Sequence, residues 1–167
     1  MDNDVPVAEM VQNALIQLDI RYEIIHCKPE FADTNAFCLQ YGYPEKNSGN
    51  TIIVAGKSEP KMYAACLVSA IARLDVNHTV RSILGMRRVS FASSEETQEF
   101  TRMSIGGVTV FGLPAEMPIY LDPNLRDLDY VILGSGSRYG KLKLGPIELE
   151  KIPNAVFVDG LANEGNH

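Results

Sequence analysis

The sequence contains no apolar segment long enough to cross a membrane as a helix. Its longest apolar-looking run, residues 62–72, has about half the length that a bilayer span requires, and Ser69 interrupts it. The first residues are acidic and lack the basic-then-apolar order of a signal peptide. We therefore expect no membrane partner, and we interpret residues 62–72 as a buried strand followed by a turn.

Cysteine is scarce, and the few cysteines are not paired. Cys27, Cys38 and Cys66 make an odd count, and no two of them have CxxC spacing. Disulfide frameworks belong to proteins of oxidising compartments. This usage favours a reducing, cytoplasmic location and disfavours a structural zinc site.

The chain has no excess of positive charge, since its formal net charge is −6 at pH 7. A protein that holds nucleic acid along its length is usually basic, because neutralised phosphates supply most of the affinity. We therefore expect no DNA partner and only a local contact with RNA. Basic residues gather at Lys57 and Lys61, at Arg87 and Arg88, and at Arg138, Lys141 and Lys143. A solvated sheet edge would carry the same clusters.

What is present is the composition of one globular domain. With 167 residues, 46% of them hydrophobic, the chain can form one core, and we treat residues 1–167 as a single domain. Apolar spacing and capping residues predict helices at 6–18, 34–41, within 73–84, at 94–102 and at 146–151. Apolar runs predict strands at 22–26, 51–55, 62–68, 88–92, 108–111, 119–121, 130–133, 141–144 and 155–158. This order indicates an α+β domain around one twisted mixed sheet.

A glycine pair, Gly106-Gly107, lies between a predicted helix and a predicted strand. Glycines free the backbone for positive φ and let another molecule approach main-chain N–H groups closely. Such a turn can hold an anion or a carbonyl oxygen without a charged side chain. We interpret the pair as the floor of a site; the alternative is a bulge or tight turn in a core sheet.

A second glycine-rich segment, Gly134 to Lys141, fails as a phosphate-binding motif. Ser135 stands where a P-loop needs its first glycine, and Leu142 follows the lysine in place of Ser or Thr. A strand, not a helix, follows it, which excludes a dinucleotide fingerprint. We expect a hairpin loop that presents Ser135, Ser137 and Arg138 to a site.

The sequence gives little evidence for a metal site or for a nucleophilic catalytic residue. His26, Cys27 and Cys38 are the one grouping that suggests a metal, but buried cysteines and a hydrogen-bonded histidine explain it equally, and we expect no metal and no cofactor. No serine occupies a nucleophile elbow. Asp75 and Asp122 are candidate bases, although both lie where helix caps or turns favour aspartate.

Five short segments, taken in their order and spacing, carry a family resemblance. They are Asn50-Thr-Ile-Ile-Val, Arg73-Leu-Asp, Gly106-Gly-Val, Asp122 and Gly136-Ser-Arg. Together they resemble the YbaK family, free-standing aminoacyl-tRNA deacylases related to the editing domain inserted in bacterial prolyl-tRNA synthetases. The resemblance covers residues 22–158 and implies a single α+β domain, with helices surrounding a curved mixed sheet.

The resemblance implies hydrolysis of the ester that joins a wrong amino acid to the 3′-terminal ribose of a tRNA. The catalytic group would be the backbone N–H donors of Gly106, Gly107 and Val108, which would stabilise the developing oxyanion, together with Asn50. The substrate would be a tRNA acceptor end, and no cofactor is implied. Substrate-binding residues would be Thr51, Ile53, Asp122, Ser135, Gly136, Ser137 and Arg138.

The sequence departs from the family pattern at several positions. Asn50 stands where the family usually has a lysine, and an amide carries no cation. Val110 replaces a usual proline, and Arg102 and Tyr139 replace usual glycines. Two hypotheses stay open. One is a divergent trans-editing deacylase; the other is a catalytically silent module that recognises an aminoacyl-adenosine-like ligand or a protein partner.

Overall fold

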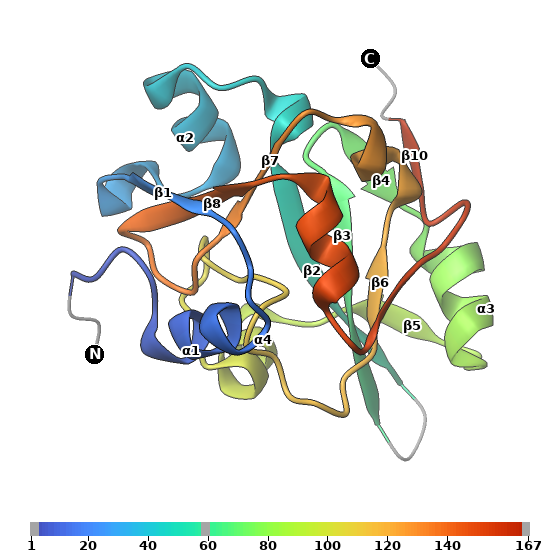
Figure 1. Cartoon of the computed structure of the whole chain (residues 1–167). Helices are drawn as coiled ribbons and strands as arrows, with labels where there is room; N and C mark the ends of the chain where they lie inside the picture. Colours follow the sequence, from blue (N-terminus) through green and yellow to red (C-terminus); the bar gives the residue numbers. More distant parts are fainter. Residues whose placement is uncertain (1–3, 58–60, 165–167) are drawn as a thin grey trace.

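A mixed five-stranded sheet forms the centre of the computed structural model, which describes residues 4–57 and 61–164 (Figure 1). Its strand order is β5-β2-β3-β6-β9. The β2–β3 hairpin and the β5–β2 pair are antiparallel, whereas β6 pairs parallel with both β3 and β9. The strands are β2 (Gly49–Gly56), β3 (Met62–Ser69), β5 (Val89–Phe91), β6 (Ile119–Leu121) and β9 (Ala155–Phe157).

Two smaller sheets complete the strand structure. An antiparallel sheet has the order β1-β8-β7, and a two-stranded ladder pairs β10 with β4. A parallel bridge between Ser48 and Ile132 joins the start of β2 to β7. Within the described residues, the strands thus form three sheets in place of the expected single sheet. The strands are β1 (Glu23–His26), β4 (Ala72–Leu74), β7 (Val131–Gly134), β8 (Gly140–Leu144) and β10 (Ala162–Glu164).

Short helices surround the sheets (Figure 1). In α1, Val11 and Leu15 are fully buried in the main core. At the start of α4, where the sequence predicts a helix, Ser93 and Glu96 form a reciprocal capping box. The helices are α1 (Glu9–Gln17), α2 (Thr34–Tyr41), α3 (Arg81–Leu84), α4 (Ser94–Thr101) and the short turns η1 (Pro29–Phe31), η2 (Glu45–Asn47), η3 (Val76–Val80), η4 (Pro123–Asp127) and η5 (Pro146–Lys151).

One local prediction was wrong. Residues 108–111 form no strand, and a backbone group of this segment is bonded to a side chain in place of a neighbouring strand: Thr109 N–H donates to Met103 Sδ at 3.4 Å. The helix predicted within residues 73–84 is confirmed from Val76 onward: Asp75 caps the π-helical turn η3, which continues directly into α3. Arg73 and Leu74, which precede it, belong to β4, which pairs with β10.

The predicted architecture, an α+β domain with a mixed sheet, is confirmed. No described helix has the length and hydrophobicity needed to cross a membrane. In the part of the chain that the structure describes, no three His, Cys, Asp or Glu side chains gather closely enough to hold a metal ion.

Candidate functional site

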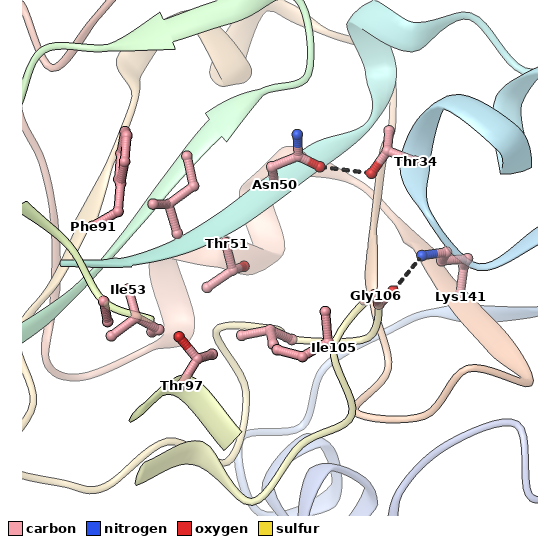
Figure 2. Close-up of a pocket in the computed structure, with 14 residues that line it drawn as sticks. Thr34, Asn50, Thr51, Ile53, Phe91, Thr97, Ile105, Gly106 and Lys141 are labelled. Carbon is pink, nitrogen blue, oxygen red and sulfur yellow. Dashed lines mark hydrogen bonds between the residues drawn. The ribbon is translucent and has the colours of Figure 1, made fainter. Parts of the chain in front are cut away.

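A pocket of about 330 Å³ lies between β2 and the loop at residues 105–108 (Figure 2). Besides this loop, six elements contribute to the lining: α2, β2, β5, α4, β7 and β8. They meet because β5 pairs with β2, the bridge at Ser48 joins β2 to β7, and β7 pairs with β8. Thr97 enters from α4, which the Ser93 cap fixes at its first turn. The lining residues are Thr34, Gly49, Asn50, Thr51, Ile52, Ile53, Phe91, Ala92, Thr97, Ile105, Gly106, Val108, Gly134 and Lys141.

Strand β2 supplies three residues that the sequence places in the site. The Asn50 Oδ1 atom accepts a hydrogen bond of 2.7 Å from Thr34 Oγ1, drawn as a dashed line in Figure 2. Thr51 Oγ1 is buried and has no hydrogen-bond partner among the described residues. Ile53 is buried and contributes an apolar wall. A buried hydroxyl without a partner costs free energy, so Thr51 is a polar group of β2 whose hydrogen-bonding capacity is unmet among the described residues.

The glycine turn forms the opposite wall. Gly106 takes a φ of 91°, and a Cβ there would lie 2.3 Å from the Arg138 guanidinium. The Gly107 N–H does not serve the pocket, because it donates to the Ser104 carbonyl at 2.8 Å. Gly106 and Val108 line the pocket, and within the described residues their N–H groups donate to no other atom. Of the three N–H groups that the sequence suggested as donors, those of Gly106 and Val108 are thus without an acceptor among the described residues, and that of Gly107 is not.

Lys141 lines the same pocket and was not among the predicted site residues. Its side chain is buried, with 6% of the residue's surface exposed. Its Nζ donates to the Ala32 carbonyl at 2.5 Å. It also donates to the Gly106 carbonyl at 2.9 Å, which Figure 2 draws as a dashed line. Among the described residues, no carboxylate oxygen lies within 4.0 Å of this ammonium group. A cation without a paired anion thus borders the pocket.

The electrostatic surroundings of Lys141 act in both directions. Burial lowers the pKa of its ammonium group, and the Arg138 guanidinium lowers it further. The Cys27 and Cys38 thiols and the Asp33 carboxylate raise the same pKa, but by less than burial lowers it. The net effect is a pKa below the usual value of 10.5.

Alternation along β8 explains why sequence reasoning missed Lys141. Leu142 and Leu144 point into the core. The alternating pattern therefore predicts that Lys141 and Lys143 lie on the opposite face of the strand, exposed to solvent. That face is covered by α2, and Lys141 Nζ lies 5.6 Å from the centroid of the Phe37 ring. A sequence does not reveal which helix covers an amphipathic strand, although two lysines beside one glycine-rich loop were a usable signal.

Several expected site residues lie outside this pocket and already have partners. Arg138 Nη1 donates to the Ile105 carbonyl at 2.7 Å, and Nη2 donates to the Pro29 carbonyl at 2.7 Å. Ser135 Oγ donates to the Gly140 carbonyl at 2.8 Å. Arg138 therefore holds the glycine turn through the Ile105 carbonyl, on the side away from the pocket lining. With Gly136 and Ser137 it lines a separate cavity of about 570 Å³.

The remaining expected residues are held by the backbone. Ser137 Oγ donates to the Val5 carbonyl at 2.5 Å. Asp122 is buried at the start of η4, where it accepts a hydrogen bond from Asn124 N–H at 3.0 Å. Burial raises the pKa of the Asp122 carboxyl above its ordinary value, and this hydrogen bond offsets only part of the rise. The structure thus gathers Asn50, Thr51, Ile53, Gly106 and Val108 in one pocket. The other predicted substrate-binding residues lie outside it: Asp122, Ser135, Gly136, Ser137 and Arg138.

Comparison with known proteins agrees with this architecture. A candidate trans-editing enzyme for prolyl-tRNA synthetase is 24% identical, with a TM-score of 0.80 over 96% of this chain and 99% of its own. The hypothetical protein APE2540 is 22% identical, with a TM-score of 0.82 over 93% of this chain and 100% of its own. These likenesses show a shared fold. The family model described as "Aminoacyl-tRNA editing domain" matches residues 28–152, and the chain therefore belongs to the aminoacyl-tRNA editing domain family.

Proposed function

We propose that this protein is a trans-editing deacylase, which hydrolyses the ester between a mischarged amino acid and the 3′-terminal ribose of a tRNA. Membership of the editing domain family supports the reaction class. The observation that carries the proposal is the pocket itself, in which the unpartnered Thr51 hydroxyl faces the Gly106–Val108 turn. An ester substrate needs hydrogen-bond donors and a shaped cavity more than it needs a reactive side chain.

The reaction would proceed by attack of water on the ester carbonyl carbon. The carbonyl oxygen becomes an oxyanion, and the N–H groups of Gly106 and Val108 are the donors available to it. One well-placed donor of this kind contributes roughly 3–4 kcal/mol to transition-state stabilisation. The bond between carbon and the ribose oxygen then breaks. One proton of the attacking water goes to the ribose oxygen, the other goes to solvent, and the free amino acid leaves as its carboxylate.

Lys141 supplies the pocket with a positive charge, which Asn50 on the opposite wall does not. Its Nζ contacts the Gly106 carbonyl, so it orients the peptide unit between Gly106 and Gly107 and places a cation beside the turn. A cation in a site shielded from water stabilises developing negative charge more strongly than it would in bulk solvent. We infer that Lys141 compensates in part for the lysine that the family pattern leads one to expect on β2.

The dimensions of the pocket favour a small amino acid. A volume of about 330 Å³ is near the lower end of the range for small-molecule sites. Ile53, Ile105 and Val108 narrow it, and exclusion by size would set the specificity. The substrate contact would be local to the acceptor end, as the net charge of −6 requires.

A second candidate is a silent binding module of the same fold, which would recognise an aminoacyl-adenosine-like end or a protein partner without cleaving it. The hydrogen bond between Asn50 and Thr34 favours this alternative, because it occupies a polar group of β2 that would otherwise face a substrate. Calorimetric titration with a non-hydrolysable aminoacyl-adenosine analogue would then show binding in a protein that leaves the corresponding ester intact.

The deacylase proposal is tested with a panel of tRNAs, each charged with a cognate or a noncognate small amino acid. We expect one or a few mischarged species to lose their ester at least tenfold faster with the protein than without it. Correctly charged tRNAs in the same panel provide the control for specificity. Ester loss at the uncatalysed rate for every member would contradict the proposal.

A further inference from the structure

Another cavity, of about 510 Å³, concentrates positive charge. Among the described residues, its lining contains four cationic side chains and no carboxylate: Lys57, Arg81, Arg87 and Arg88, with Asn77, Val89 and Ser90. We call this set the basic groove. All four cations are exposed. They are four of only 15 lysines and arginines in a chain of net charge −6, so the groove creates a local positive field on an acidic protein.

The backbone holds these cations side by side. Lys57 N–H donates to the Arg88 carbonyl at 2.9 Å, which extends the β2–β5 ladder by one more pair. Arg81 Nη1 lies 3.5 Å from the Arg87 carbonyl oxygen. Within the described residues, none of the four cations forms an ion pair with a carboxylate. Neighbouring like charges without acidic partners repel one another, and an external anion would relieve that repulsion.

Strand β5 connects the basic groove to the pocket. Val89 and Ser90 line the groove, whereas Phe91 and Ala92, the next two residues, line the pocket. A strand advances about 3.3 Å per residue, so the backbone of Arg88 lies roughly 10 Å from that of Phe91. Phe91 is 59% exposed, and Figure 2 shows it at one side of the pocket. A ligand could therefore have its end in the pocket and its charged backbone on the groove.

We propose that the basic groove binds the phosphodiester backbone of a tRNA acceptor end whose 3′ ester occupies the pocket. The inference rests on the proposed function for the identity of the ligand and adds the surface that holds the rest of it. A nucleic acid strand fits better than an acidic peptide, because the groove continues into an exposed aromatic ring on which a base can stack. The contact stays local, as the negative net charge requires.

The direct test is binding of unfractionated deacylated tRNA at several salt concentrations. The groove variant carries Arg87→Gln and Arg88→Gln, and a matched control carries Arg21→Gln and Arg126→Gln. The control removes the same charge from two exposed arginines that do not line the groove. We expect the groove variant to bind at least tenfold more weakly at low salt. The slope of log affinity against log salt should become shallower by about 2, because two phosphate contacts are lost.

A second measurement separates this inference from the proposed function. Both variants are assayed on the mischarged tRNA and on the same amino acid esterified to adenosine, which has no phosphodiester backbone. A loss at least tenfold larger on the tRNA than on the adenosine ester supports the groove. If no substrate is hydrolysed but the binding difference holds, the groove stands and the deacylase proposal fails. If hydrolysis occurs and both variants match the wild type in affinity and salt slope, the groove is refuted and the deacylase proposal stands.

Discussion

Lys141 Nζ lies 2.9 Å from the Gly106 carbonyl oxygen, which ties a buried ammonium group on β8 to the turn that faces β2. The two residues are 35 positions apart, and the contact closes one side of the pocket. Because Arg138 also donates to Ile105 in the same turn, two cations fix the turn from different sides. The turn is thus held by neighbouring side chains and does not depend on a ligand for its shape.

The first prediction concerns the charge of Lys141. Lys141→Met should lower the rate of ester hydrolysis by about 100-fold, because it removes both the cation and the donor that orients Gly106. Adding Asn50→Lys to this variant should raise the rate of ester hydrolysis at least tenfold above that of Lys141→Met alone, since it places a cation on β2, the opposite wall of the pocket. Single-turnover rates on a mischarged tRNA provide the measurement.

Lys143→Met is the matched control for that experiment. Lys143 lies on the same face of β8, two residues away, and its Nζ lies 4.6 Å from the centroid of the Tyr130 ring, outside the pocket. Its removal should change the rate by less than threefold. Equal losses of rate for Lys141→Met and Lys143→Met would contradict a specific role for Lys141, because they would show that any positive charge near β8 has the same effect.

The second prediction concerns two buried hydroxyls. Thr51 and Thr109 each have an Oγ1 without a partner among the described residues, so replacing either by valine removes a desolvated polar group. Thr51→Val and Thr109→Val should each raise the free energy of unfolding by about 1 kcal/mol. Urea unfolding measures this, and a destabilised Thr109→Val protein would show that its hydroxyl has a partner after all.

The third prediction uses the cap of α4. Ser93 Oγ accepts a hydrogen bond from Glu96 N–H at 3.0 Å, and Ser93→Ala should lower the free energy of unfolding by about 1 kcal/mol. Ser94→Ala, one residue later, lacks this capping bond and is the control. Because α4 carries Thr97 into the pocket, only the first substitution should also raise KM for the ester. Equal unfolding free energies for the two variants would contradict the role of the cap.

The local patterns that the sequence displays were sufficient for much of this fold. The helix at 94–102 and the apolar strands at 51–55 and 62–68 are encoded within a few neighbouring residues, and they are confirmed as α4, β2 and β3. The role of Gly107 was harder to predict. Its N–H donates to the Ser104 carbonyl, and its carbonyl accepts a hydrogen bond from Gly136, a residue 29 positions away. Lys141 was missed for the same reason: the helix that covers it is distant in sequence.

The fourth prediction concerns the pH dependence of stability. The pKa of the Asp122 carboxyl is raised by burial, so between pH 3.8 and its folded pKa the native state holds more protons than the unfolded state. The contribution of Asp122 to stability is therefore fully present below pH 3.8 and is lost as pH rises through the folded pKa. Asp122→Asn does not titrate, so the stability of the wild type relative to this variant should fall across that window. A difference that stays constant with pH would contradict the assignment.

The most direct test of the pocket as a hydrolytic site is ester loss from a mischarged tRNA, followed under single-turnover conditions for the wild type, Thr51→Val and Thr109→Val. We predict rapid loss with the wild type and with Thr109→Val, and a rate about tenfold lower with Thr51→Val, since only Thr51 lines the pocket. Equal rates for all three proteins, or no loss above the uncatalysed rate with the wild type, would contradict the account.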